Sequence, residues 1–138
     1  AARGTYAGAT YDKKDIAGFT AAVRAGQGVF YVPDQNAARR TVFVPFLGVQ
    51  AATLGAIGGV LRRGGGRVLL MWARRDADGR QHIDLQPAWS DWPEADETAT
   101  AARYVEWIGE RLQAAPEQYL WVHRRFKTRP PGEPSLYR

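Results

Sequence analysis

The sequence predicts an α/β fold with a mostly parallel sheet flanked by helices and one antiparallel hairpin. Helix-like and strand-like segments alternate along most of the chain, which is the pattern typical of such a fold. Hydrophobic residues make up 45% of the 138 residues, enough for a core, and this length suits one domain. No apolar run approaches the roughly 20 residues that a membrane-spanning helix needs.

The first half of the chain alternates between helix and strand signals. Residues 6–11 could form a short strand, and Asp12 can cap a helix that begins at Lys13 and has apolar residues at helical spacing. Residues 28–33 are β-branched and aromatic and predict a buried strand. Within residues 41–47, Pro45 argues against a central strand. Residues 51–63 predict a helix, which the glycines at 64–66 end.

The second half contains the hairpin and the clearest helix. Residues 67–72 predict a strand, and an Asp-Gly turn within residues 76–79 leads to residues 80–85, which should pair back antiparallel. A helix is predicted over residues 94–115, with Asp91 as a possible cap and Pro93 in its first turn. Its apolar face is formed by Ala101, Val105, Ile108 and Leu112.

Charge divides the chain into two parts. Residues 1–117 carry 14 Lys/Arg and 13 Asp/Glu, whereas residues 118–138 carry five Lys/Arg and one acid, Glu133. We therefore expect the α/β region to cover residues 1–117, with a basic, proline-containing tail over residues 118–138 packing on it. A local basic segment indicates an anionic neighbour, such as phosphate, a lipid headgroup, an acidic protein or nucleic acid.

A carboxylate and an amide, Asp34 and Gln35, follow the predicted strand at residues 28–33. Ligands of open α/β sheets bind beyond the carboxyl ends of strands, although Asp34 could equally cap a turn. Arg39 and Arg40 follow in the same loop and could hold a phosphate in a bidentate fork. The alternative is that both arginines lie in a solvated loop.

The tail contains the most concentrated basic run, residues 123–130 (HRRFKTRP), in which Arg124, Arg125 and Lys127 surround an aromatic residue. Such runs are usually solvated faces. This one follows Tyr119-Leu120-Trp121, and aromatic residues next to Lys/Arg are typical of a membrane interface. Nucleic acid is the competing partner.

The chain lacks the usual signatures of a self-sufficient enzyme. It has no cysteine, which excludes disulfides and thiolate metal sites, and its histidines, His82 and His123, form no metal-binding pattern. The glycines at 64–66 are not followed by Lys-Ser/Thr, so they form no P-loop. No nucleophile elbow is present.

Several segments closely resemble the lipid A lauroyl/myristoyl acyltransferases. The longest is residues 115–130 (APEQYLWVHRRFKTRP), at the end of the chain. Residues 30–35 (FYVPDQ), 42–48 (VFVPFLG), 51–53 (AAT) and 13–15 (KKD) also match in the expected order. The resemblance spans nearly the whole chain and identifies it as the C-terminal portion of such an enzyme.

The resemblance implies an O-acyltransferase with a glycerolipid-acyltransferase-like fold, of which this chain holds part. The family moves a fatty acyl chain from acyl carrier protein to a hydroxyl of a Kdo-bearing lipid A precursor, at the cytoplasmic face of the Gram-negative inner membrane. No metal or other cofactor is implied. Its catalytic H-x4-D/E motif is absent here, because the fifth residue after His82 is Pro87 and after His123 is Thr128.

We therefore expect no catalytic residue in this chain, and the fragment alone should be inactive. The predicted partners are the acyl-carrier-protein donor, the lipid A precursor and an anionic membrane surface, and no nucleic acid is expected. The alternative is a non-catalytic basic module that binds anionic lipid or nucleic acid. The predicted substrate-binding residues are Asp34, Gln35, Arg39, Arg40, Arg124, Arg125 and Lys127.

Overall fold

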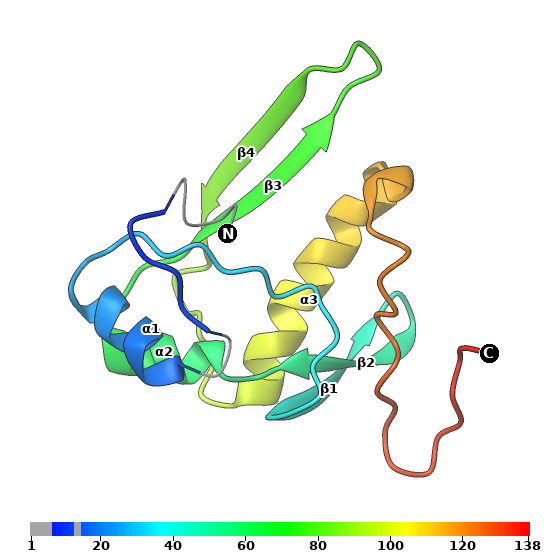
Figure 1. Cartoon of the computed structure of the whole chain (residues 1–138), viewed down its shortest axis with the longest axis horizontal. Helices are drawn as coiled ribbons and strands as arrows, with labels where there is room; N and C mark the ends of the chain where they lie inside the picture. Colours follow the sequence, from blue (N-terminus) through cyan, green and yellow to red (C-terminus); the bar gives the residue numbers. More distant parts are fainter. Residues whose placement is uncertain (1–6, 13–14) are drawn as a thin grey trace.

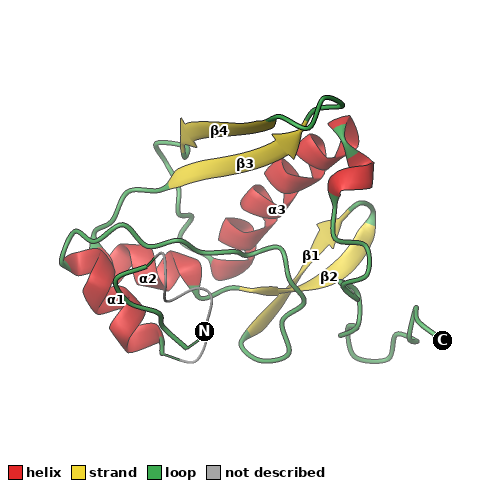
Figure 2. Cartoon of the chain, turned by 45° about the horizontal axis from the view of Figure 1, so that its top comes forward, coloured by secondary structure: helices red, strands yellow, loops and turns green. Residues whose placement is uncertain are grey.

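A computed structural model describes residues 7–12 and 15–138, in which one long helix lies between two β-hairpins (Figures 1 and 2). Two shorter helices pack against each other at one end of the molecule, and the tail runs down the opposite side (Figure 1). The elements are α1 (Ile16–Arg24), β1 (Thr41–Phe46), β2 (Val49–Leu54), α2 (Ile57–Gly64), β3 (Leu69–Arg75), β4 (Gln81–Pro87), α3 (Glu97–Ala114) and the 3-10 turn η2 (Pro116–Gln118).

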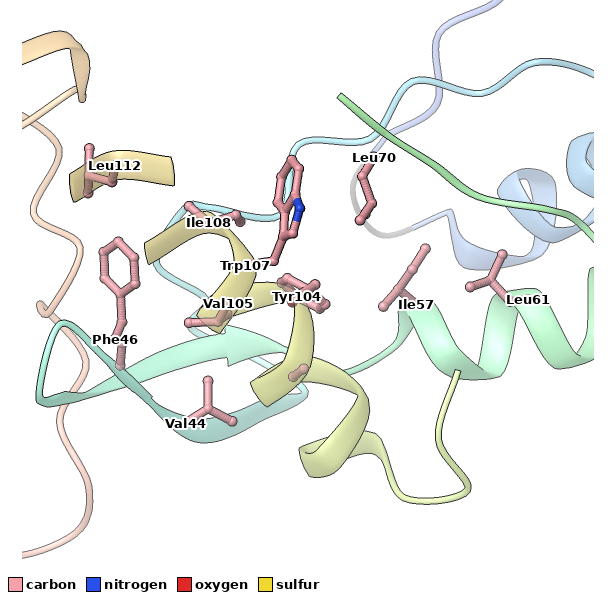
Figure 3. Packing of buried hydrophobic residues seen from close by; sticks show 12 residues of the cluster. Val44, Phe46, Ile57, Leu61, Leu70, Tyr104, Val105, Trp107, Ile108 and Leu112 are labelled. Atoms are coloured by element: carbon pink, nitrogen blue, oxygen red, sulfur yellow. The ribbon is translucent and has the colours of Figure 1, made fainter. Parts of the chain in front are cut away.

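The long helix α3 confirms the helix predicted at residues 94–115, and its apolar face is buried as expected. It begins after Asp96, whose side chain accepts a hydrogen bond from the Ala99 amide at 2.7 Å. Asp96 therefore caps the helix, and the predicted cap, Asp91, instead forms an ion pair with Arg103 at 2.9 Å. The apolar face of α3 meets Val44 and Phe46 of β1 and contributes half of the twelve buried residues of the core cluster (Figure 3).

The predicted antiparallel hairpin is confirmed as β3 paired with β4, which covers the other side of α3. Its inner face carries Trp72, whose ring meets the Trp107 ring of α3 edge-on at 6.4 Å. The apolar side chains at alternate positions lie on the outer face and are exposed; they are Leu69, Met71, Ile83 and Leu85.

The helix predicted at residues 51–63 is wrong in its first half. Residues Val49–Leu54 form β2, which pairs antiparallel with β1, and α2 starts only at Ile57. The missed signal is the two-residue turn at Leu47 and Gly48, where φ is 51° and 80°. Two consecutive positive φ angles make the turn type that joins tightly paired strands.

The strand predicted at residues 28–33 is also wrong, because these residues adopt no regular structure and pair with no strand of the described chain. Phe30 is 72% exposed and Val32 46% exposed. Composition favours a strand here, but a strand needs a neighbour for its backbone N–H and C=O groups.

At the start of the chain, Lys13 and Lys14 lie outside the described residues, as does Tyr6 of the possible first strand. Residues 7–12 contain no strand. The cap of α1 is Asp15, which accepts from the Gly18 amide at 2.8 Å, and not Asp12. The two sheets of the described residues are each two-stranded and antiparallel, so the mostly parallel sheet stays a prediction.

Candidate functional site

The structure brings together two of the segments that the sequence singled out, the loop after Pro33 and the basic tail. The Tyr119 hydroxyl donates to the Asp34 carbonyl at 3.2 Å. The Asn36 amide donates to Nε2 of His123 at 2.9 Å. The Asn36 side chain also exchanges two bonds with Thr128, donating from Nδ2 to the hydroxyl at 3.1 Å and accepting from the Thr128 amide at 3.0 Å. We call this the loop–tail junction.

Arg125 is turned into the protein and is only 2% exposed. Its guanidinium donates to the Ala52 carbonyl at 2.5 Å and to the Thr53 hydroxyl at 2.7 Å. It also lies 5.5 Å from the centre of the Phe46 ring. Burial lowers the pKa of Arg125, an effect opposed first by Tyr119. This guanidinium therefore holds the tail against the β1–β2 hairpin.

Of the other basic residues within residues 124–129, one is turned toward β2 and two are exposed. Arg129 donates to the Gln50 carbonyl at 2.7 Å and pairs with Glu133. Carbonyls of alternate residues point to the same side of a strand, so Arg125 and Arg129 cap the same edge of β2. Arg124 is exposed, with its guanidinium 5.7 Å from the Tyr137 ring centre, and Lys127 is exposed.

Asp34 is half-buried at the loop–tail junction, and Gln35 beside it is exposed. Among the described residues, Oδ1 of Asp34 is buried and has no hydrogen-bond partner. Burial raises the pKa of Tyr119 to about 12, with a smaller contribution in the same direction from the Asp34 carboxylate. The junction thus combines a carboxylate oxygen without a donor and an exposed amide on a loop that the tail fixes in place.

Arg39 and Arg40 are both exposed, and the structure places only Arg40 in a hollow. Arg40 has φ 50° and its carbonyl accepts from the Gly55 amide at 3.4 Å. The hollow is also lined by Arg24 and Arg63, which come from α1 and α2. Arg40 thus lies beside arginines of α1 and α2, whereas Arg39 does not line this hollow, and a substrate-binding role for either stays a prediction.

Sequence reasoning missed the residues that assemble these features. Asn36 and His123 are 87 positions apart, and nothing in their local sequence indicates that they meet. The His123 ring accepts through Nε2, so that nitrogen carries no proton while the bond exists. Arg24 and Arg63 stand at helix ends, where a favourable interaction with the helix dipole is sufficient to explain them.

The part of the chain that the structure describes contains no helix with both the length and the apolar character needed to cross a membrane. Within the same residues, no cluster of three or more His, Asp or Glu side chains is arranged to hold a metal ion.

Comparison with known proteins places the whole chain alongside one group of enzymes. The sequence model of a family described as bacterial lipid A biosynthesis acyltransferase matches residues 2–128. The chain is 41% identical over 131 residues to the lipid A biosynthesis lauroyltransferase of Escherichia coli (strain K12), which covers 91% of this chain and 42% of that protein. It is 37% identical over 128 residues to the palmitoleoyltransferase of the same organism, with the same coverage.

A third relative is the lipid A biosynthesis myristoyltransferase of Escherichia coli (strain K12). It is 33% identical over 141 residues, which cover 99% of this chain and 43% of that protein. The chain thus spans about two fifths of the length of the curated relatives that it matches.

Proposed function

This chain belongs to the bacterial lipid A biosynthesis acyltransferase family, and we propose that it is the C-terminal region of an enzyme that moves a fatty acyl chain from acyl carrier protein to a hydroxyl of a Kdo-bearing lipid A precursor. The observation that carries the proposal is identity of 33–41% to three such transferases over at least 91% of the chain. The three relatives differ in the acyl group of their names, so the proposal covers fatty acyl transfer in general and no single chain length.

In the proposed reaction the acceptor hydroxyl oxygen attacks the thioester carbonyl carbon. The C–S bond breaks, an ester C–O bond forms, and the hydroxyl proton ends on the leaving thiol. A general base close to the hydroxyl assists this step. We assign that base to the H-x4-D/E motif, which this chain lacks, so the chain contributes substrate binding and no catalytic residue.

The loop–tail junction supports a substrate-binding role for Asp34 and Gln35. Side chains that bind substrate must be held in a fixed position by the residues around them. Asn36 makes three hydrogen bonds to the tail, and the Asp34 carbonyl accepts one from Tyr119. We propose that the tail keeps this loop in the geometry that the acceptor requires.

The exposed basic residues support an encounter with anionic partners. Arg39, Arg124 and Lys127 face solvent. Acyl carrier protein is acidic, and an anionic leaflet attracts each nearby Lys or Arg by about 1 kcal/mol. We propose that these side chains orient the enzyme at the cytoplasmic face of the inner membrane. The nucleic-acid alternative gains no support, because Arg125 and Arg129 are turned toward β2 and leave a shorter accessible basic run.

The test is an acyl-transfer assay on a protein in which this chain is joined to the upstream half of a family member. The assay uses an acyl-carrier-protein thioester and a Kdo-bearing lipid A precursor. We expect turnover by the joined protein and none by the 138-residue chain alone. Asn36→Ala should reduce turnover of the joined protein at least tenfold, because it removes both side-chain bonds to Thr128 and leaves only the backbone bond to His123.

The matched control is Gln113→Ala, at an exposed position on α3, which should leave turnover unchanged. Turnover by the isolated chain would show that the catalytic residues lie within these 138 residues, so that their assignment to the H-x4-D/E motif is wrong. If the joined protein is folded and inactive with every acyl donor, the proposed reaction is wrong.

A further inference from the structure

An open hollow beside α1 is lined by three arginines, which come from α1, from α2 and from the loop before β1. Arg24 is the last residue of α1, Arg40 directly precedes β1, and Arg63 lies in the last turn of α2. The hollow has a volume of about 520 Å³, within the range of about 300–1,000 Å³ that is typical of ligand sites. We call it the arginine hollow.

The charge of the arginine hollow is strongly unbalanced. Its lining includes three arginine residues and one acidic residue, Asp15, whose carboxylate is already engaged as the cap of α1 through its bond from the Gly18 amide. Among the described residues, none of the three arginines forms an ion pair. The lining therefore carries a net charge of +2, which no ion pair with another described residue offsets.

The donors of these side chains are mostly unused. Arg24 donates one hydrogen bond, from Nη2 to the Arg63 carbonyl at 3.0 Å, and this bond joins the ends of α1 and α2. The guanidinium groups of Arg40 and Arg63 donate to no acceptor within the described residues. Each guanidinium has five N–H donors in a planar fork that fits phosphate oxygens.

Close contact between α1 and α2 holds the arginines around the hollow. A Cβ atom at Gly64 would lie 2.7 Å from Cγ1 of Val23, so the glycine allows the C-terminal ends of the two helices to meet. Arg24 directly follows Val23, and Arg63 directly precedes Gly64. Their convergence with Arg40 is a consequence of helix packing and not of local sequence.

We propose that the arginine hollow is a phosphate-binding subsite formed by Arg24, Arg40 and Arg63, which takes a phosphate group of the lipid acceptor. Phosphate is favoured because two free guanidinium forks can share its oxygens in bidentate pairs. An opening to solvent suits a headgroup that remains attached to a larger lipid. The assignment to the acceptor rests on the proposed function, whereas the phosphate chemistry rests on the hollow itself.

The test measures binding of the 138-residue chain to phosphatidylcholine vesicles that contain a phosphorylated lipid A precursor. Parallel vesicles contain the same lipid after phosphatase treatment, or phosphatidic acid. We expect binding at least tenfold tighter to the phosphorylated precursor than to its dephosphorylated form. Arg63→Ala should weaken that binding about tenfold or more, since a hydrogen bond to a charged group is lost.

The matched control is Arg67→Ala, at an exposed arginine that precedes β3 and does not line the hollow. It should change binding less than twofold, and Arg63→Lys should weaken binding less than Arg63→Ala. Circular dichroism confirms that each variant is folded. Equal losses in Arg63→Ala and Arg67→Ala would overturn the proposal, because diffuse surface charge would then explain the binding.

The remaining outcomes separate the subsite from the reaction. If Arg63→Ala weakens binding to phosphatidic acid as much as to the precursor, the assignment to the acceptor is overturned. If binding depends on the precursor's phosphates and on Arg63 while the joined protein transfers no acyl group, the subsite is supported and the proposed reaction fails.

Discussion

Replacing Arg125 with alanine tests whether the basic tail is a structural part of the domain. The Arg125 side chain is 2% exposed and donates hydrogen bonds to the Ala52 carbonyl and the Thr53 hydroxyl. Its neighbour Arg124 carries the same charge but is exposed, with its guanidinium 5.7 Å from the centre of the Tyr137 ring. Arg124→Ala is therefore a control matched in charge, size and sequence position.

The expected loss of stability follows from these contacts. Two hydrogen bonds from a charged group contribute about 1.5–3 kcal/mol each, and the substitution also removes a buried charge whose desolvation costs several kcal/mol. The Ala52 carbonyl keeps its bond from the Ala37 amide, so it is not left without a donor. We expect Arg125→Ala to lower the free energy of unfolding by about 2–3 kcal/mol, and Arg124→Ala by less than about 0.5 kcal/mol.

The assay is urea unfolding of the 138-residue chain followed by tryptophan fluorescence. With a slope near 2 kcal/mol/M, Arg125→Ala should lower the midpoint by about 1–1.5 M. Arg125→Lys should fall between the wild-type chain and Arg125→Ala, because a lysine cannot make both bonds in the same geometry. Equal midpoints for Arg125→Ala and Arg124→Ala would refute a structural role for the tail.

Three further predictions concern other contacts. Gly64→Ala should lower the free energy of unfolding by about 1–3 kcal/mol, because the new Cβ would lie 2.7 Å from Val23. A Cβ at Gly28 would meet no atom within 4 Å, so Gly28→Ala should lower the free energy of unfolding by less than about 0.5 kcal/mol. Similar urea midpoints for the two variants would contradict this prediction. Burial raises the pKa of Tyr119 from 10.0 to about 12, so the contribution of Tyr119 to stability is complete below pH 10 and is lost as the pH rises from 10 to 12. The urea midpoint should therefore fall between pH 10 and pH 12, and it should fall less steeply in Tyr119→Phe. The same steepness in Tyr119→Phe and the wild-type chain would count against this prediction. Leu47→Asn should raise the urea midpoint by about 0.3–0.5 M. Leu47 has φ 51°, and asparagine adopts this backbone conformation at a cost about 0.5–1 kcal/mol lower than leucine does. A lower midpoint would mean that the contacts of the leucine side chain outweigh this backbone strain.

The elements that the sequence predicted well are those that depend on local signals. The helix α3 has an acidic first turn, an apolar stripe and a proline after its end, and all three signals lie within the helix or beside it. The β3–β4 hairpin is similarly marked by its Asp-Gly turn. Such signals act over a few residues, so they can be read without knowledge of tertiary contacts.

The two elements that were predicted wrongly are one whose turn carries a weak local signal and one that has no pairing partner among the described strands. The Leu47-Gly48 turn has no strong hairpin signature in its first residue, so β2 was interpreted as the start of a helix. Residues 28–33 have strand-like composition and still form no strand, because no described strand lies beside them. That an upstream strand pairs with residues 28–33 in a longer protein stays a prediction.

The candidate site was predictable in location and not in the role of each arginine. Two of the segments that the sequence singled out, the loop after Pro33 and the basic tail, contact each other in the structure. Charge alone could not separate Arg125, which bonds inside the protein, from Arg124, which is exposed. That distinction depends on which side of the tail faces β2, and no regular hydrophobic pattern marks it.

The capping of β2 by Arg125 and Arg129 has a consequence for synthesis of the protein. The bond from Arg125 to the Ala52 carbonyl joins residues 73 positions apart, so translation at about 5–20 residues per second leaves the edge of β2 without its arginines for roughly 4–15 s. An uncovered strand edge can pair with another chain. The nascent protein should therefore depend most on chaperones in this interval, and a ribosome stalled between these positions should yield an aggregation-prone chain.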